Sequence, residues 1–312
     1  MEHVDNEGIA QVLDLISIYY KIEKDKRRED AYSNAAKSIL GADDEITSGA
    51  EAKLLPGVGV GIAKDIDELL NTGKIERLEQ LEYKYREVKP VIDHFMSFYG
   101  IGPVTAVIFY NRGYRTVDDL WAKASLTDAQ KNGILWRDHF AERIPREEMD
   151  IINNIVGEIF KQNNIKYAIT GSYRRQEPTS GDIDILIEAN DNINMDLIIK
   201  LLDQYIPTIL SKGKKKFAGV FRLSEDDVGR RLDILLIKPE SWAFALLHFT
   251  GSGRFNILMR NKAKSLGMKL SEYSLKDENG DLLSANSEED IFDYLGVKYL
   301  APVERTKILK AL

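Results

Sequence analysis

Residues 171–184, GSYRRQEPTSGDID, decide the fold and the chemistry that we expect of this chain. A Gly-Ser turn and two arginines lead to Asp182, Ile183 and Asp184, where an apolar run predicts a β-strand. Because side chains alternate along a strand, Asp182 and Asp184 should share one face. Two adjacent carboxylates repel each other unless a cation lies between them, and such hard oxygen ligands suit Mg²⁺. The stretch therefore predicts a phosphate-binding turn beside a divalent metal site.

A third acid, Asp233, lies in a second β-like run, residues 231–237 (RLDILLI). Arg231 shares the strand face of Asp233, so both side chains should point into one cleft. A lone Asp-x-Asp is usually a solvated strand or turn, and Arg231 can also be only a charge-balancing partner of the acids. Three acids on neighbouring strands, with Ser, Gly and Arg nearby, favour a two-metal site that transfers a nucleotide from a triphosphate.

The composition is that of a folded chain, with 312 residues, a formal net charge of −7 and no cysteine. The length predicts two to four subdomains, and the lack of cysteine excludes disulfides and thiol catalysis. We expect no membrane span, because no long apolar run occurs, and no secretory leader, because the acidic start lacks a basic segment. Acids outnumber bases in residues 1–90, so any DNA binding there must rest on local geometry rather than on bulk charge.

A Gly-hydrophobic-Gly turn occurs twice, in residues 55–59 (LPGVG) and 99–103 (YGIGP), each time before a helical apolar pattern. Glycines let the backbone approach a phosphate closely, and the following helix presents its free N–H groups there. One such turn is more often a plain helix–helix connection, but two copies favour DNA-binding helix-hairpin-helix units. The glycines expected to bind DNA are Gly57, Gly59, Gly100 and Gly102.

Three further motifs lie in the second half of the chain: RIPREEM at residues 143–149, FTGS at 249–252 and FNILMR at 255–260. Together with the motifs above, they make the chain resemble the family X DNA polymerases, of the polymerase beta type, from about residue 8 to the end. The resemblance implies a DNA-directed DNA polymerase. Such an enzyme adds dNTPs to a primer 3′-hydroxyl in short-gap, base-excision type DNA repair.

The residue patterns and this resemblance predict an α+β fold. A helical N-terminal region with two helix-hairpin-helix units should precede a nucleotidyltransferase palm sheet and a small mixed α/β C-terminal subdomain. The expected domains are a lyase-like helical domain (residues 1–84), a helix-hairpin-helix DNA-binding subdomain (85–144), the palm (145–240) and a nucleotide-selecting subdomain (241–312).

The resemblance also implies roles for individual residues. Asp182, Asp184 and Asp233 are the implied catalytic ligands of two Mg²⁺ ions, for which Mn²⁺ can substitute, and Asp233 would accept the primer hydroxyl proton. Arg231 and Arg260 are implied DNA contacts, on the primer and template side respectively. The implied nucleotide-binding residues are Arg143, Gly171, Ser172, Arg175, Ser180, Gly181, Phe249, Gly251 and Asn256. A Na⁺ or K⁺ ion is implied at hairpin carbonyls, those of Lys53, Leu55, Val58, Met96, Phe98 and Ile101.

The N-terminal region departs from the resembled pattern at one position. Polymerases of the beta type form a Schiff base to the abasic sugar with a lysine, but here Asp65 stands at that place, and a carboxylate cannot form an imine. Lys64 is adjacent, although a shift of one residue rotates a side chain by about 100° on a helix. Arg28 and Tyr32 match the rest of the lyase pocket. The hypothesis is that this domain positions gapped DNA but has lost or weakened its 5′-deoxyribose phosphate lyase activity.

His248 is a second departure, because the resembled family carries tyrosine before Phe-Thr-Gly. That Tyr-Phe pair helps to exclude the 2′-hydroxyl of ribonucleotides. Both a harmless polar substitution at the rim of the site and a changed discrimination between sugars are compatible with the sequence.

Two alternatives to a templated DNA polymerase stay open: a template-independent or ribonucleotide-tolerant nucleotidyltransferase, and a catalytically weak DNA-binding scaffold. A small-molecule nucleotidyltransferase has no need of two hairpins for a DNA backbone. The expected partners are gapped or nicked duplex DNA and dNTPs, with no membrane, and the expected state is a monomer. The expected location is intracellular, in the nucleus, or in a viral factory or the cytoplasm for a viral or prokaryotic protein.

Overall fold

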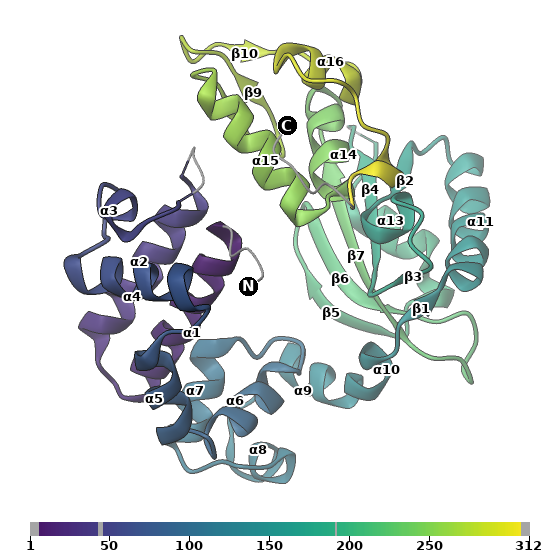
Figure 1. Cartoon of the computed structure of the whole chain (residues 1–312). Helices are drawn as coiled ribbons and strands as arrows, with labels where there is room; N and C mark the ends of the chain where they lie inside the picture. Colours follow the sequence, from purple (N-terminus) through teal and green to yellow (C-terminus); the bar gives the residue numbers. More distant parts are fainter. Residues whose placement is uncertain (1–5, 43–45, 191, 307–312) are drawn as a thin grey trace. The chain divides into compact units, whose positions relative to one another are not determined.

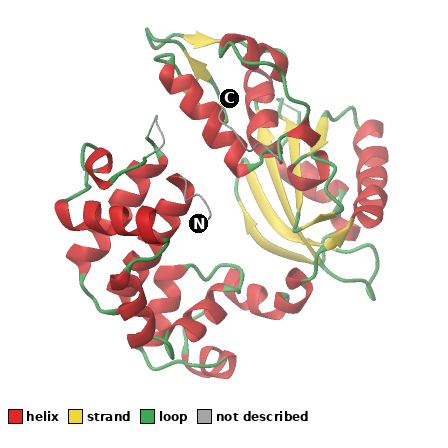
Figure 2. Cartoon of the chain, in the orientation of Figure 1, coloured by secondary structure: helices red, strands yellow, loops and turns green. Residues whose placement is uncertain are grey.

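The computed structural model describes residues 6–42, 46–190 and 192–306, which belong to two compact units, residues 1–130 and 131–312. Within the described ranges, strands occur only in the second unit, whereas the first is built from helices (Figure 2). The predicted α+β class, with a helical N-terminal region followed by a sheet, is therefore confirmed. The finer division into four subdomains remains a prediction.

The first unit begins with a helical hairpin whose apolar residues recur at helical spacing. Ile9, Leu13 and Ile16 of the first helix are fully buried, and Ile39 of the second is buried as well. Asp25 caps the second helix by accepting a hydrogen bond from the next turn. The helices of this unit are α1 (Asn6–Ile22), α2 (Lys26–Leu40), α3 (Gly49–Ala52), α4 (Val60–Thr72), α5 (Glu76–Lys84), α6 (Lys89–Met96), α7 (Pro103–Asn111) and α8 (Val117–Lys123).

The two glycine-containing turns have the same backbone geometry. Gly57 and Gly100 adopt φ values of +82° and +79°, which side-chain-bearing residues rarely adopt. Gly59 and Gly102 then cap α4 and α7 in nearly identical extended conformations, with φ of −83° and −84°. The predicted repeat of a helix, a turn and a second helix is thus confirmed for α3–α4 and α6–α7.

The second unit contains a five-stranded sheet in the order β2-β4-β7-β6-β5 (Figure 1). β4 and β7 are parallel, and the other neighbouring pairs are antiparallel. The strands of this sheet are β2 (Tyr167–Ile169), β4 (Ile183–Glu188), β5 (Thr208–Lys212), β6 (Lys216–Phe221) and β7 (Arg230–Ile237).

The remaining elements of this unit surround that sheet or follow it, and α9 begins just before the division between the units. The helices are α9 (Asp128–Leu135), α10 (Arg137–Ala141), α11 (Arg146–Gln162), α12 (Gly171–Arg174), α13 (Met195–Leu201), α14 (Trp242–Thr250), α15 (Gly253–Ser265) and α16 (Glu288–Tyr294). The short strands are β1 (Ile144–Pro145), β3 (Thr179–Ser180), β8 (Lys269–Leu270), β9 (Leu275–Lys276) and β10 (Leu282–Leu283). Single 3₁₀ turns are η1 (Asp203–Tyr205), η2 (Pro239–Ser241) and η3 (Pro302–Glu304).

One face of the central sheet is buried under α11 and α13, and the other carries the polar residues. Leu232 and Ile234 of β7 belong to the core formed with these helices, so Arg231 and Asp233 face the opposite side. Each fully buried aliphatic side chain contributes about 1.5–3 kcal/mol, which holds the register of the strands. Helix α14 covers the far end of the polar face through Leu186, and the acids lie on the part that remains open.

No helix in the described ranges combines the length and the apolar character needed to cross a membrane.

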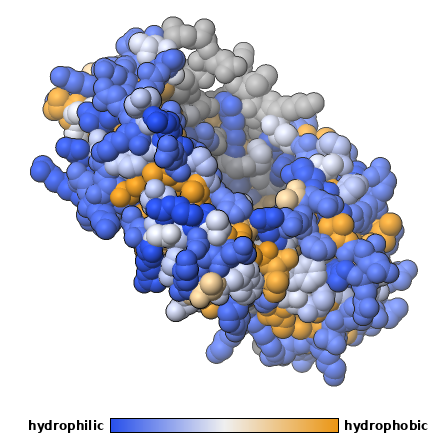
Figure 3. Space-filling model, turned by 90° about the horizontal axis from the view of Figure 1, so that it is seen from below, coloured by the Kyte–Doolittle hydropathy of each residue, from blue (hydrophilic) through white to orange (hydrophobic). Residues whose placement is uncertain are grey.

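The face of the molecule shown in Figure 3 is mainly hydrophilic, with hydrophobic residues in small groups. Two exposed apolar side chains flank the first hairpin turn, Leu54 at 85% and Val60 at 57% exposure, and Val104 and Ile108 lie exposed after the second turn. Both hairpins therefore expose apolar side chains to solvent.

Candidate active site

Three acids meet on the open face of the sheet. Asp184 and Asp233 are direct neighbours in the parallel pairing of β4 with β7, and Asp182 immediately precedes β4. A carboxylate oxygen from each of the three residues lies within 4.8 Å of the others. The predicted convergence of these acids is confirmed, and its cause is the register of the two parallel strands.

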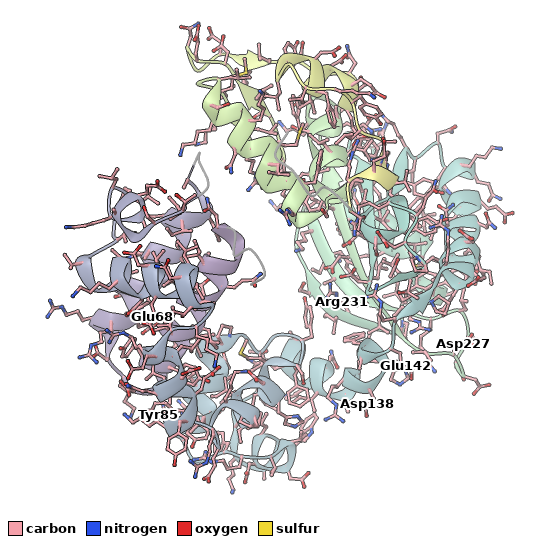
Figure 4. The ribbon with its side chains drawn as sticks, in the orientation of Figure 1. Glu68, Tyr85, Asp138, Glu142, Asp227 and Arg231 are labelled. Atoms are coloured by element: carbon pink, nitrogen blue, oxygen red, sulfur yellow. The ribbon has the colours of Figure 1, made fainter. Side chains whose placement is uncertain are left out.

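Crowding of the carboxylates has an electrostatic consequence. Burial, together with the like charge of Asp233, raises the pKa of Asp184 to about 6. Arg231, labelled in Figure 4, forms an ion pair with Asp182, and its Nε lies 3.2 Å from an Asp233 carboxylate oxygen. Arg231 is therefore the charge-balancing partner of the acids in this structure, and its contact with a primer remains a prediction.

The acidic cluster fits a divalent cation by its chemistry. All three side chains offer hard carboxylate oxygens, which Mg²⁺ and Mn²⁺ accept. The pKa of Asp184 is raised because burial and the Asp233 charge destabilise its carboxylate form. A cation held by Asp182, Asp184 and Asp233 would supply the positive charge that stabilises this form. Among the described residues, this is the one group of three or more acids or histidines close enough to hold a metal ion.

The glycine turn of the opening motif lies directly against these acids. Gly171 begins α12 with a φ of +59°, and a Cβ atom there would lie 2.9 Å from a carboxylate oxygen of Asp184. Cβ atoms essentially never lie this close to another heavy atom. Glycine at position 171 therefore allows the turn to lie directly against the Asp184 carboxylate. The Ser172 hydroxyl donates to the Ser180 hydroxyl at 3.0 Å, which joins the two Ser-Gly pairs of the motif.

Arg143 reaches the same region from the segment before β1. Its Nε donates to Thr179 Oγ1 at 2.7 Å and its Nη2 donates to the Thr179 carbonyl at 2.8 Å. A Cβ atom added to Gly181 would lie 3.6 Å from the Arg143 guanidinium. The structure thus brings Arg143, Ser172, Ser180 and Gly181 together, as a shared phosphate-binding role requires.

Arg175 contacts the C-terminal part of the second unit in this structure. Its Nη1 donates to the Thr250 carbonyl at 2.7 Å, and its Nε donates to Thr306 Oγ1 at 3.1 Å. Burial lowers the pKa of Arg175. Its Nε and Nη1 are thus bonded to the segment after α16 and to the end of α14, while its charge still lowers the pKa of Asp184, so its contact with a phosphate remains a prediction.

A cleft of about 380 Å³ opens in front of the acids. Asp184, Asp233 and Arg231 line it together with the predicted nucleotide-binding residue Phe249. Lys216 lines it as well and acts on Asp184 by lowering its pKa, although burial dominates. From the sequence, this lysine was interpreted only as part of a basic run, residues 214–216, at a solvated strand-to-strand turn, because its place beside the acids depends on the assembled sheet. Thr170 and Tyr273 also line the cleft, and sequence reasoning did not identify them.

The remaining predicted nucleotide residues lie at the junction of α14 and α15. Gly251 ends α14 with a φ of +65°, and the chain turns there toward α15. The Asn256 side-chain amide donates to the His248 carbonyl at 2.7 Å. Asn256 is therefore held by the backbone of the preceding helix, and its contact with an incoming base remains a prediction.

A buried ionic network ties the phosphate turn to the C-terminal region, and the sequence did not reveal it. Arg174 donates to both carboxylate oxygens of Glu288, at 3.0 and 2.6 Å, and Arg305 donates to one of them at 2.6 Å. Arg305 is fully buried, and its guanidinium lies 5.0 Å from the Phe255 ring centroid and 5.5 Å from that of Phe292. The sequence offered one hint of this network, a second arginine next to Arg175. The partners of Arg174 could not be predicted, because Glu288 and Arg305 are distant in sequence.

In the first unit, Asp65 is buried and bonded rather than exposed to a substrate. The Tyr32 hydroxyl donates to its carboxylate, and Arg77 Nε donates to the same oxygen at 3.0 Å. Burial and the neighbouring Asp65 carboxylate raise the pKa of Tyr32. Lys64, next in the chain, lies exposed on the helix. The structure thus brings Tyr32 and Asp65 together, and places the Lys64 side chain outside their contact.

Arg28 lies near the same cluster. Its guanidinium carbon is 5.2 Å from the centroid of the Tyr20 ring, and that ring is 5.5 Å from the ring of Tyr32. Arg28 and Tyr32 therefore share an aromatic surface, as the predicted pocket requires, but a lysine amine is absent from the described cluster of Tyr20, Arg28, Tyr32, Asp65 and Arg77.

The hairpin carbonyls follow one pattern in both copies. The Leu55 carbonyl accepts a hydrogen bond from the Val58 amide at 3.3 Å, and the Phe98 carbonyl accepts one from the Ile101 amide at 3.1 Å. A carbonyl oxygen has two lone pairs, so these bonds leave room for a further ligand. A monovalent cation at the six predicted carbonyls, including those of Lys53 and Met96, stays a prediction.

Comparison with known protein families accounts for most of the chain in four consecutive segments. Residues 4–75 match a helix-hairpin-helix domain, and residues 93–141 match the fingers domain of DNA polymerase lambda. Residues 143–239 match the DNA polymerase beta palm, and residues 245–306 match the DNA polymerase beta thumb. The palm match contains all three acids and the phosphate turn.

Three individual DNA polymerases are similar to this chain, and each alignment covers 96% of it. DNA polymerase lambda from Rattus norvegicus is 32% identical, and the match covers 56% of its length. DNA polymerase lambda from Arabidopsis thaliana is 29% identical with 62% of its length covered, and the human DNA-directed DNA/RNA polymerase mu is 27% identical with 69% covered. The chain thus spans less than two thirds of the length of either polymerase lambda.

Proposed function

Because this chain belongs to the family X DNA polymerases, we propose that it is a DNA-directed DNA polymerase that fills short gaps during DNA repair in the nucleus. The observation that carries the proposal is the pairing of Asp184 with Asp233, with Asp182 beside them and the Gly171 turn against them. This geometry places a phosphate-binding turn next to three carboxylates, which suits transfer of a nucleotide to a hydroxyl.

In the proposed reaction, the primer 3′-hydroxyl attacks the α-phosphate of a dNTP, and pyrophosphate leaves. Asp233 accepts the hydroxyl proton, since it shares a strand face with Arg231, which we place at the primer terminus. Ser172, Ser180 and Arg143 hold the triphosphate, because a guanidinium pairs bidentately with phosphate oxygens. Asp182, Asp184 and Asp233 would hold two Mg²⁺ ions, whose charge would stabilise the charge that develops on the phosphate. For this, Arg231 must leave Asp182 and Asp233 and form a contact with the primer instead.

The two hairpins hold the DNA backbone in this proposal. Their glycines leave the backbone accessible, and the helices that follow direct free N–H groups outward. The backbone carbonyls of Lys53, Leu55 and Val58 would hold a Na⁺ or K⁺ ion at the first hairpin, and those of Met96, Phe98 and Ile101 would hold one at the second. The enzyme is proposed to act as a monomer on gapped or nicked duplex DNA.

Extension across a one-nucleotide gap with a 5′-phosphate tests this proposal. With Mg²⁺ we expect addition of the complementary dNTP, with a preference over the other three of about 10²-fold or more. Little addition is expected on a single-stranded primer. Equal addition to the single strand would instead support a template-independent transferase, and failure to extend any primer would support a DNA-binding scaffold.

We further propose that this chain lacks 5′-deoxyribose phosphate lyase activity. Asp65 cannot form an imine, and its carboxylate is held by Tyr32 and Arg77. Borohydride treatment with a 5′-incised abasic DNA substrate should therefore give no covalent adduct, while gap filling by the same preparation persists. A strong adduct that disappears in Lys64→Ala would contradict this expectation, because it would show that the exposed lysine serves as the nucleophile.

A further inference from the structure

His248, near the end of α14, contacts both Asn256 and Arg260, the residues proposed to contact the incoming base and the template strand. Its Nδ1 lies 3.4 Å from Arg260 Nη2, and its carbonyl accepts the Asn256 amide at 2.7 Å. A guanidinium has only donors, so Nδ1 must be the acceptor and the proton of the neutral ring must lie on Nε2. One residue thus contacts both Asn256 and Arg260, through its backbone and its side chain.

A second group contacts the same nitrogen of Arg260. Glu272, in the connection between β8 and β9, has a carboxylate oxygen 3.6 Å from the same Nη2 atom of Arg260. The Nη2 atom of Arg260 therefore contacts both an imidazole acceptor and a carboxylate. These two contacts fix the orientation of the guanidinium that would face a template strand.

We propose that His248 is a positioning residue that holds Arg260 in a resting arrangement, which a template strand must displace before Arg260 can contact it. The inference rests on the proposed polymerase function and deepens it. It assigns to His248 an effect on template engagement that is separate from any effect on the sugar of the incoming nucleotide. Because the contact with Arg260 is long and partly exposed, we expect an effect of a few fold.

The charges around His248 give the contact a pH dependence. Burial lowers the pKa of His248, the Arg260 guanidinium lowers it further, and Glu272 opposes the shift. The neutral ring accepts from Arg260 near pH 8. Protonation at lower pH would place two cations in contact, and the resting arrangement would then open.

Two substitutions separate this role from simple packing. His248→Phe keeps a ring but removes the acceptor, whereas His248→Asn places an amide oxygen near the position of Nδ1 and cannot be protonated. On the one-nucleotide gap at pH 8, we expect His248→Phe to lower the KM for the complementary dNTP by about 2–5-fold, with a smaller effect on kcat. His248→Asn should keep a KM close to that of the wild type.

The pH profile completes the test. Because the pKa of His248 is lowered, the KM ratio of wild type to His248→Phe should keep its pH 8 value down to about pH 6.5 and fall toward one only below it, while the ratio of His248→Asn to His248→Phe should stay constant. Equal KM values of wild type and His248→Phe at pH 8, or an asparagine variant that behaves like phenylalanine, would overturn the inference. An enzyme without any gap extension would refute the polymerase proposal instead.

NMR titration of His248 tests the contact without any activity. Arg260→Met removes the neighbouring cation, so we expect the pKa of His248 to rise relative to the wild type. An unchanged pKa would show that the imidazole and the guanidinium are not in contact in solution, and the inference would fail.

Discussion

Asp233→Asn is expected to lower kcat for gap filling by about 10³-fold or more while the protein stays folded. Asparagine keeps the size of the side chain but loses the negative charge that would hold a cation and the basicity that would accept the hydroxyl proton. The substitution also removes a like charge beside Asp184, whose pKa is raised partly by Asp233. Single-turnover extension of a one-nucleotide gap measures the loss.

Asp226→Asn provides the matched control, because Asp226 is an exposed acid in the same unit, in the loop before β7. It changes the net charge equally and should leave the rate of extension near the wild-type value. Thermal unfolding of both variants checks that each is folded. A folded Asp233→Asn variant with a rate within about 10-fold of the wild type would contradict the assignment of Asp233 as a catalytic residue.

Glu288→Gln is expected to lower the free energy of unfolding by about 3–5 kcal/mol. Glu288 is buried and bonded to Arg174 and Arg305, and Arg305 is itself fully buried. Neutralising the acid leaves the fully buried Arg305 and the partly buried Arg174 without their counter-charge. Because Arg174 belongs to α12, we also expect the phosphate turn to loosen and the KM for dNTP to rise. Denaturant unfolding and steady-state extension measure the two effects.

The neighbouring substitution Glu289→Gln separates the network from the general effect of losing one charge. Glu289 is exposed on the first turn of α16, so its loss should change the unfolding free energy by no more than about 0.5 kcal/mol. Equal stability of the two variants would mean that the Arg174–Glu288–Arg305 network contributes nothing, despite its burial.

Much of the site could be read from local sequence because it depends on short-range rules. Strand alternation placed Arg231 and Asp233 on one face, and the parallel pairing of β4 and β7 confirmed it. Both glycine turns were found for the same reason, since the positive φ at Gly57 and Gly100 is a property of each turn by itself. Such rules did not predict the contacts that the Arg175 guanidinium makes with the end of α14 and Thr306, and its contact with a phosphate remains a prediction.

The sequence by itself determined the α+β class, the repeated hairpins and the three acids, because periodicity and turn chemistry act between residues that are close in the chain. Only the tertiary structure decided which charges neutralise one another. Arg231 lies against Asp182 and Asp233, Glu288 joins two arginines, and Asp65 is held by Tyr32. These partners are set by which strands and helices pack together, and the cost of separating them depends on how deeply each pair is buried.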